Sequence, residues 1–427
     1  MVGGSTDDIG AGELYQALKA LVPKKVAASN PRKKGVKYPL HAAARKGNQE
    51  EVQRLITAGV EIDAGNTYGY TALHIAVQKG HTATVQLLLE QGANIDAIGK
   101  HGYTALHLAA EKSHEELLEF LIKKGARFSD VRIGVQPLFF WAAEKGHAAT
   151  VQLLLDRGAS IDAINEDGYT ALHRAALNGH TETVELLLDR KATIDSINKD
   201  GNTALHWASQ QGHTATVELL LKKGANIHAK DKNGRTAIYW PSVKGFDKIV
   251  KLLVERVADI NVQNNAGNTP LHIAATEGDL KTVMYLLESV AHINVQNNAG
   301  NTPLHIAATK GDLKTVMYLL ERVVDINVQN NAGNTPLHFA AHKGHYGAVE
   351  FLIHRCADIN AKNTNGKTPL HVAAANGHSG VVQSLINANA DINVTDKNGR
   401  AALDMAREKG HDEVVLLLDS FSFIRGL

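Results

Sequence analysis

A module of 33 residues is repeated twelve times in succession along this chain of 427 residues, without an insertion or a deletion. The copy from Thr71 reads TALHIAVQKGHTATVQLLLEQGANIDAIGKHGY, and those from Thr269 and Thr302 differ at only four positions. A fixed period of this length indicates a repeat architecture, in which each copy packs mainly on its neighbours. Repeats one to twelve begin at Tyr38, Thr71, Thr104, Pro137, Thr170, Thr203, Thr236, Thr269, Thr302, Thr335, Thr368 and Ala401.

Each module predicts two helices and a turn. When positions are counted from 1 at Thr71, position 1 is usually a hydroxyl residue that can cap a helix. Positions 3, 6, 7 and 10, typically Leu, Ala, Ala and Gly, form one helical stripe whose small residues allow close approach. Val85, Leu88 and Leu89 mark a second helix, and Gly92 at position 22 suits a left-handed helix end. Polar residues such as those at 165–168 then form a tight turn.

A single module cannot bury its own apolar stripes, so the copies are expected to stack side by side. Thr-Pro-Leu-His at 269–272, 302–305, 335–338 and 368–371, and Thr-Ala-Leu-His at 71–74, 104–107, 170–173 and 203–206, resemble the ankyrin repeat. The resemblance covers Tyr38 to about Ser420. It implies an all-α solenoid of helix-turn-helix repeats with projecting β-turn fingers, whose partners bind along the inner face of the first helices and the finger tips.

The two ends of the chain depart from the module. We expect a separate segment over 1–37, with one amphipathic helix over 12–21 and a basic stretch from Pro23 to Lys37, before a repeat array over 38–427. The basic stretch is interpreted as a solvated linker, with nuclear import or an acidic partner as the alternative. In the last repeat, Asp404 and Arg407 stand at positions 4 and 7, which favours a polar C-terminal cap.

Composition bounds the classes of function. The net charge of +1 gives no electrostatic reason to expect nucleic acid or an anionic membrane as a partner. Cys356 is the single cysteine, so no internal disulfide can form and a reducing compartment is expected. No run of about 20 apolar residues is present to span a bilayer. We therefore expect a cytoplasmic monomer.

The 22 histidines do not predict a metal site or an acid–base centre. Nine occupy position 4, as at His74, and eight occupy position 11, as at His81, so the repeat itself explains most of them. The resemblance implies a framework role for them. The near match to a phosphate-binding loop at 361–368 lacks its first glycine, and HEELL at 114–118 lacks the second histidine of a zinc protease. We expect no catalytic site, metal or cofactor.

The residue type at position 22 changes in the later repeats. Val257, Val290, Val323, Cys356 and Asn389 replace the usual glycine there. Branched side chains disfavour a left-handed helix end, which predicts looser or differently shaped ends at these sites. We interpret Cys356 as a small structural residue, with thiol chemistry as the alternative.

Position 5 carries the residues that best predict a partner-binding site. Positions 5, 8, 9 and 12 point away from the packing stripe, and all three tryptophans of the chain occupy position 5, at Trp141, Trp207 and Trp240. Arg174 holds position 5 of repeat five. Trp and Arg are the residues most enriched at binding hot spots. The alternative, left open by the sequence, is that large side chains at position 5 only cover the helices beneath them.

Repeats four and seven are the irregular ones. Repeat four has Phe140 at position 4, and Val135 replaces the glycine of its preceding turn, which predicts a reshaped finger. Repeat seven carries Pro241 inside its first helix, which predicts a distortion beside Trp240. We therefore expect a partner-binding patch centred on repeats four to seven, made of Tyr70, Tyr103, Phe140, Trp141, Glu144, Tyr169, Arg174, Trp207, Gln210, Gln211, Tyr239 and Trp240.

These features favour a non-catalytic scaffold or adaptor that binds another protein. The alternative is an inhibitor or regulator of an enzyme partner. A further alternative is an effector that an intracellular bacterium delivers into a host cell, because near-identical copies resemble ankyrin arrays of such bacteria.

Overall fold

The computed structural model describes residues 38–99, 102–128, 137–256, 258–322 and 325–425. These residues form 24 helices and no strand, which confirms an all-α repeat solenoid. The chain divides into two compact units, residues 1–94 and 95–427, which are described separately. The expected helix over 12–21, the basic stretch over 23–37 and the turn around Val135 lie outside the described residues.

Each repeat contributes a pair of antiparallel helices. The first helices are α2 (Pro39–Lys46), α4 (Ala72–Gln78), α6 (Ala105–Glu111), α8 (Leu138–Lys145), α10 (Ala171–Leu177), α12 (Ala204–Gln211), α14 (Tyr239–Lys244), α16 (Pro270–Glu277), α18 (Pro303–Lys310), α20 (Pro336–Lys343), α22 (Pro369–Ala375) and α24 (Ala402–Lys409). The second helices are α3 (Gln49–Thr57), α5 (Thr82–Glu90), α7 (Glu115–Lys123), α9 (Ala148–Asp156), α11 (Thr181–Asp189), α13 (Thr214–Lys222), α15 (Asp247–Glu255), α17 (Leu280–Glu288), α19 (Leu313–Leu320), α21 (Tyr346–His354), α23 (Ser379–Asn387) and α25 (Asp412–Arg425).

The threonine at position 1 begins the first helix, as the sequence predicts. Thr170 is extended, and its side chain accepts a hydrogen bond from the His173 backbone N–H. In return the Thr170 backbone N–H donates to Nδ1 of His173 over 3.1 Å. This reciprocal arrangement satisfies two N–H groups that a helix start would otherwise leave unpaired.

The predicted stripe forms the core. Leu172, Ala175 and Ala176 of α10 are buried, and Val184 and Leu187 of α11 face them. Glycine at position 10 permits close approach of the next repeat. A Cβ atom added to Gly146 would lie 2.5 Å from Nδ1 of His180, which is closer than atoms can approach.

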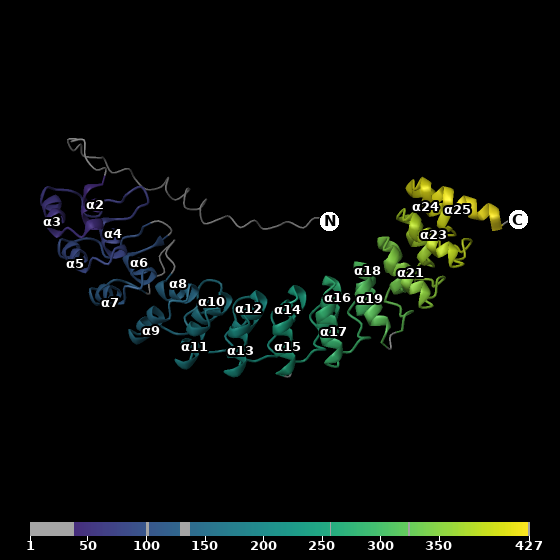
Figure 1. Cartoon of the computed structure of the whole chain (residues 1–427), viewed down its shortest axis with the longest axis horizontal. Helices are drawn as coiled ribbons and strands as arrows, with labels where there is room; N and C mark the ends of the chain where they lie inside the picture. Colours follow the sequence, from purple (N-terminus) through teal and green to yellow (C-terminus); the bar gives the residue numbers. More distant parts are fainter. Residues whose placement is uncertain (1–37, 100–101, 129–136, 257, 323–324, 426–427) are drawn as a thin grey trace. The chain divides into compact units, whose positions relative to one another are not determined.

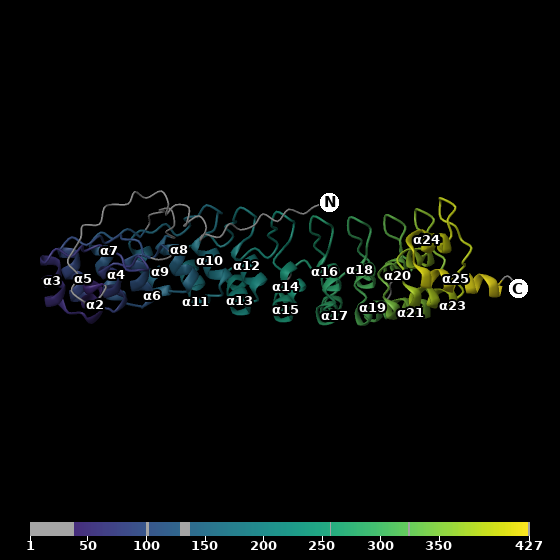
Figure 2. The same cartoon turned by 90° about the horizontal axis from the view of Figure 1, so that it is seen from above.

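In the unit from Ile95 onward, successive pairs stack in chain order (Figure 1), with the first helices along one side and the second helices along the other. The turns that join one repeat to the next project on one side of these helices (Figure 2). Backbone hydrogen bonds join neighbouring turns: Lys199 N–H donates to the Asp167 carbonyl, and Lys232 N–H donates to the Asp200 carbonyl, each over 2.9 Å.

The expectation of altered helix ends at position 22 is wrong for the three positions that the structure describes. Val290, Cys356 and Asn389 adopt φ values of 69°, 62° and 69°, the left-handed conformation that Gly158 adopts with φ of 86°. The next residue's backbone N–H needs this geometry to reach back into the helix, so the side chain is forced to follow. Val257 and Val323 lie outside the described residues.

The first helix of repeat seven is displaced, as Pro241 predicts. Helix α14 begins at Tyr239, three residues after Thr236, and has six residues. Pro241 thereby lies in the first turn, where a backbone N–H has no partner within the helix and its loss costs little. The Ser242 hydroxyl donates to the Ile238 carbonyl over 2.9 Å in the same turn.

The last repeat ends in polar side chains. Arg407 is exposed, and its guanidinium lies 2.9 Å from the carboxylate of Asp419 in α25. Asp404 accepts a hydrogen bond from the Ala401 backbone N–H over 2.9 Å, where other repeats use histidine. No helix of the described residues has the length and apolar character needed to cross a membrane.

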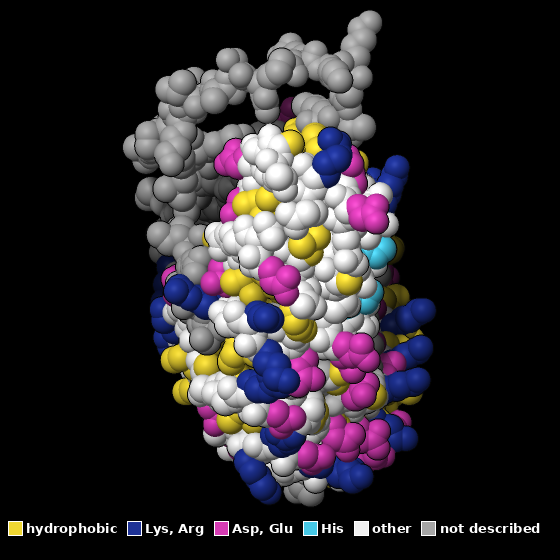
Figure 3. Space-filling model, turned by 90° about the vertical axis from the view of Figure 1, so that its left-hand side faces the viewer, with side chains coloured by type: hydrophobic (Ala, Val, Ile, Leu, Met, Phe, Trp, Pro, Cys, Tyr) yellow, Lys and Arg dark blue, Asp and Glu magenta, His cyan; other side chains and the backbone are white. Residues whose placement is uncertain are grey.

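Charges of both signs are interspersed on the face shown in Figure 3, which views the end carrying α3. Apolar side chains are scattered between them on this face. This agrees with the net charge of +1, which gives no large field of one sign.

Candidate partner-binding surface

Two of the expected surface residues are buried, which corrects the sequence prediction. Phe140 and Trp141 have only 5% and 4% of their surface exposed. The Trp141 ring stacks on His147 with centroids 5.2 Å apart, and its Nε1 donates to the Tyr103 hydroxyl over 3.3 Å. Phe140 fills the buried slot that histidine occupies in most repeats. In repeat four, therefore, the alternative reading of position 5 as cover for the helices applies.

In repeats five and six the side chain at position 5 is partly exposed. Trp207 and Arg174 are half-buried, and both lie against Tyr169, which ends the turn before repeat five. The rings of Tyr169 and Trp207 have centroids 5.5 Å apart, and the Arg174 Cζ atom lies 4.7 Å from the Tyr169 ring centroid. A guanidinium over an aromatic face is a favourable contact in a partly desolvated site. These three residues form a compact aromatic and cationic cluster.

The charge of Arg174 is weakly neutralised. Its Nη1 atom lies 3.6 Å from Oε2 of Glu144, too far for a hydrogen bond. Its Nε atom and the Nε1 atom of Trp207 are buried and have no hydrogen-bond partner. Burial raises the pKa of Tyr169, while the Asn198 side chain and Arg174 oppose this shift. The Tyr169 hydroxyl therefore stays protonated at neutral pH.

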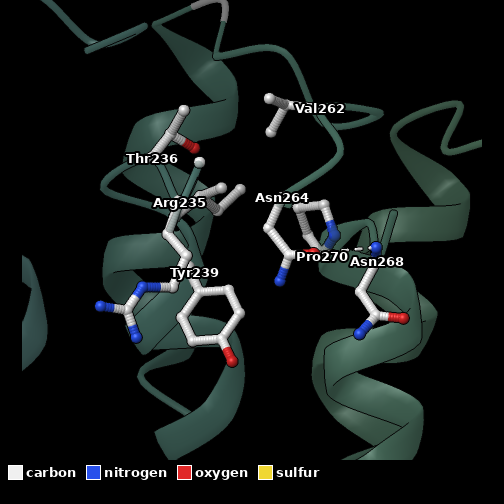
Figure 4. Close-up of a pocket in the computed structure, with 9 residues that line it drawn as sticks. Arg235, Thr236, Tyr239, Val262, Asn264, Asn268 and Pro270 are labelled. Atoms are coloured by element: carbon white, nitrogen blue, oxygen red, sulfur yellow. Dashed lines mark hydrogen bonds between the residues drawn. The ribbon is translucent and has the colours of Figure 1, made fainter. Parts of the chain in front are cut away.

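A second cation–aromatic cluster lies in repeat seven. The Arg235 Cζ atom is 5.2 Å from the Tyr239 ring centroid and 5.0 Å from that of Trp240. Unlike Arg174, Arg235 binds a buried carboxylate, because its Nη2 and Nε atoms lie 2.6 and 2.7 Å from Oδ2 of Asp231. Figure 4 shows the Arg235 and Tyr239 side chains side by side.

A small cavity separates this cluster from repeat eight. It has a volume of about 10 Å³ and lies between Arg235 and Tyr239 on one side and Asn264, Asn268 and Pro270 on the other (Figure 4). This volume is close to the minimum that holds one water molecule. The cavity is thus a packing gap and too small for a cofactor.

Polar residues surround the two clusters. Gln210 and Glu144 are half-buried at position 8, while Gln211, Lys145 and Lys244 are exposed at position 9. The Lys244 ammonium donates to the Gln210 carbonyl over 2.7 Å. Half-buried aromatic anchors within a polar rim are the arrangement found at protein–protein interfaces.

Two of the expected tyrosines are separate from these clusters. Tyr103 is half-buried and covers Trp141, with ring centroids 5.9 Å apart. Tyr70 lies in the unit that ends at Asn94, with its ring centroid 5.3 Å from that of His74. Tyr103 thus packs on repeat four, and Tyr70 is described with its own unit only.

Sequence reasoning missed the apolar side chains at position 28, in the turns. Ile164 and Ile197 have 66% and 62% of their surface exposed, and Ile98 has 44%. The later repeats carry Gln263, Gln296 and Gln329 there, whose side chains donate to the next turn's backbone. A comparison of position 28 along the array would have shown this change from isoleucine to glutamine.

The histidines at position 4 tie each first helix to the end of the turn that leads into the next repeat. His173 Nδ1 accepts from its own cap, and its Nε2 lies 3.0 Å from the Asn202 carbonyl, just before the next repeat. The N–H donor at Nδ1 and the acceptor at Nε2 fix the neutral ring with its proton on Nε2. Burial lowers the pKa of His305 and His338 to about 4. The framework role is therefore confirmed for these rings.

No group of three or more His, Cys, Asp or Glu side chains in the described part of the chain is arranged to hold a metal ion. Cys356 is exposed and adopts the left-handed helix end.

Comparison with known families gives matches along nearly the whole chain. The model described as "Ankyrin repeats (3 copies)" matches residues 10–99, 40–133, 93–165, 139–231, 226–297 and 271–363. The model described as "Ankyrin repeats (many copies)" matches residues 352–406. No curated protein matches the chain.

Proposed function

Because the chain belongs to the ankyrin-repeat family, whose repeats generally act as protein–protein interaction modules, we propose that it is a scaffold that binds a protein partner. The family is typically non-catalytic, and we propose the same of this chain. The binding site is the aromatic surface, defined here as Tyr169, Arg174, Trp207, Gln210, Gln211, Tyr239 and Trp240.

One observation carries this proposal. Repeats five to seven place Trp207 and Trp240 half-exposed at position 5, each beside a tyrosine and an arginine. Large aromatic rings that keep part of their surface in water lose that exposure when a partner docks, which makes them strong anchors. Phe140 and Trp141 support this surface from the core of repeat four and are not contacts themselves. Glu144 lies at its margin, 3.6 Å from Arg174, and Tyr103 packs on Trp141 of repeat four.

The test is affinity capture with a variant in which Trp207 and Trp240 are both replaced by alanine. We expect recovery of the partner to fall at least about tenfold, since truncation of a hot-spot residue typically costs about 2 kcal/mol or more. Phe339→Ala is the matched control, because Phe339 is a half-buried aromatic at the same position of repeat ten. Equal recovery by the double variant and the wild type would contradict the assignment.

The finer points of the proposal are separable by experiment. An activity assay of the recovered partner distinguishes a passive scaffold from an inhibitor or regulator, which would lower or change that activity on binding. We propose a cytoplasmic monomer, which fractionation and sedimentation test. Delivery into a host cell, the remaining alternative, is tested with a translocation reporter fused to the chain.

A further inference from the structure

We propose that the partner binds Arg174 through a carboxylate side chain, with an apolar residue of the partner beside it on Trp207. This rests on the proposed function and specifies the chemistry of the same surface. The starting point is the hydrogen-bonding state of the guanidinium. Among the described residues, no hydrogen bond from the Arg174 side chain is formed, and its Nε atom is buried without a partner.

Other arginines in the unit from Ile95 onward show which groups pair with a guanidinium in this fold. Arg235 and Arg400 each bind a buried aspartate, Asp231 and Asp396, whose side chains are 1% exposed. Arg174 has no counterpart of these aspartates. Within the described residues it forms an ion pair only with Glu144, at 3.6 Å, and both side chains keep about a quarter of their surface exposed, at 25% and 26%. A guanidinium left in this state has donors available for a carboxylate, which matches its planar geometry.

The surroundings add a second donor and an apolar contact. The Nε1 atom of Trp207 is also buried and unpaired, and its ring lies against Tyr169, as does Arg174. Unpaired buried donors destabilise a protein, so a ligand that supplies acceptors after a small side-chain shift gains binding free energy. Two unpaired donors next to exposed ring surface favour a ligand with an acidic group beside an apolar one.

The charges around Arg174 define the direction of approach. On the first helices, Lys145 and Lys244 add positive charge, and Glu144 is the carboxylate nearest to Arg174. On the side of the turns, Asp167 and Asp200 act electrostatically on Tyr169 and would repel an acidic group. The carboxylate is therefore expected to reach Arg174 across the first helices, over the aromatic surface.

The experiment uses the full chain and a displayed library of random linear peptides as the probe. Peptides are selected on the wild type and kept if the Trp207→Ala/Trp240→Ala variant fails to bind them. Each retained peptide is synthesised with its Asp or Glu residues intact and as Asn or Gln. Binding of both forms is measured to the wild type, Arg174→Gln and Arg174→Lys.

We expect the retained peptides to contain Asp or Glu near an aromatic or aliphatic residue. Amide replacement should weaken binding to the wild type about tenfold and leave binding to Arg174→Gln unchanged, because the two changes remove one shared contact. Arg174→Lys keeps the charge but loses the planar guanidinium. The effect of amide replacement in this variant should therefore lie between that in the wild type and that in Arg174→Gln. Lys145→Gln, which removes an exposed cation, is the control and should retain the tenfold effect.

The outcomes separate the two proposals. Retained peptides whose binding is equal in acid and amide form overturn the carboxylate at Arg174 and leave the aromatic surface as a binding site. A loss of the same size on amide replacement in the wild type and in Arg174→Gln also overturns it, because the acid then binds elsewhere. If no selected peptide depends on Trp207 and Trp240, both proposals fail.

Discussion

At the scale of single residues, position 22 combines a left-handed backbone conformation, which the repeat requires, with a branched side chain that disfavours it. Val290 adopts a φ of 69° and has 79% of its surface exposed. The left-handed conformation costs a branched residue about 1–2 kcal/mol, and an exposed side chain recovers little of this through packing. The backbone geometry is kept because the Ala291 N–H donates to the Leu286 carbonyl over 3.0 Å.

Replacing Val290 by glycine should therefore stabilise the protein. We expect the free energy of unfolding to rise by about 1 kcal/mol, measured as a shift of the urea midpoint. Gly224→Val is the reverse change and the matched control, since Gly224 has a φ of 90° and open space around it. It should lower the midpoint by a similar amount. An unchanged midpoint in Val290→Gly would show that the valine conformation is not strained.

At the scale of elements, the junction between repeats seven and eight lacks the histidine hydrogen bonds found at other junctions. His206 bonds the Arg235 carbonyl directly before repeat seven, and His272 bonds the Asn301 carbonyl directly before repeat nine. In repeat seven, Tyr239 replaces this histidine, and the displaced start of α14 leaves the cavity of about 10 Å³. Asp279 replaces the position-11 histidine that would bond back to repeat seven.

Restoring the usual residues should strengthen this junction. In the double variant Tyr239→His/Pro241→Ala, α14 can start at the threonine, and the new histidine can bond the Asn268 carbonyl. We expect a gain of about 1 kcal/mol, the net value of one buried hydrogen bond, in the free energy of unfolding. His305→Tyr is the control in repeat nine, where it removes the bond to the Asn334 carbonyl and should destabilise. A double variant no more stable than the wild type would show that the junction is not limited by this bond.

At the scale of the whole molecule, the buried neutral histidines couple stability to pH. Burial lowers the pKa of His305 and His338 from 6.5 to about 4, and it lowers those of His173, His206 and His272 in the same direction. The unfolded chain takes up protons below pH 6.5 while the folded rings remain neutral. Their contribution is thus complete above about pH 6.5 and is lost progressively as the pH falls towards 4.

The urea midpoint should accordingly fall between pH 7.5 and pH 5, by an amount equivalent to roughly 2 kcal/mol for each of His305 and His338. The variant His305→Gln/His338→Gln should be less stable at pH 7.5 but show a shallower dependence on pH. The measurement is the midpoint as a function of pH for both proteins. Parallel curves would mean that these two rings do not carry the dependence.

Much of this molecule could be predicted from the repeat alone. Thr170 and Leu172 lie where the period places them, as the cap and the core of α10, and Pro241 displaces its helix as expected. The site was predicted less well. Trp141 and Trp207 share position 5, yet one is buried and the other half-exposed.

The sequence by itself determined the fold, because a period repeated without gaps leaves one way to bury the same stripe in every copy. Only the tertiary structure decided which side chains remain accessible, since that depends on neighbours from other elements. His147 and Tyr103 close over Trp141, whereas Trp207 lies beside Arg174 and Tyr169 and keeps part of its ring in water. The tertiary structure also decided that the buried Nε atom of Arg174 has no hydrogen-bond acceptor, because the acceptors within reach depend on the neighbouring elements.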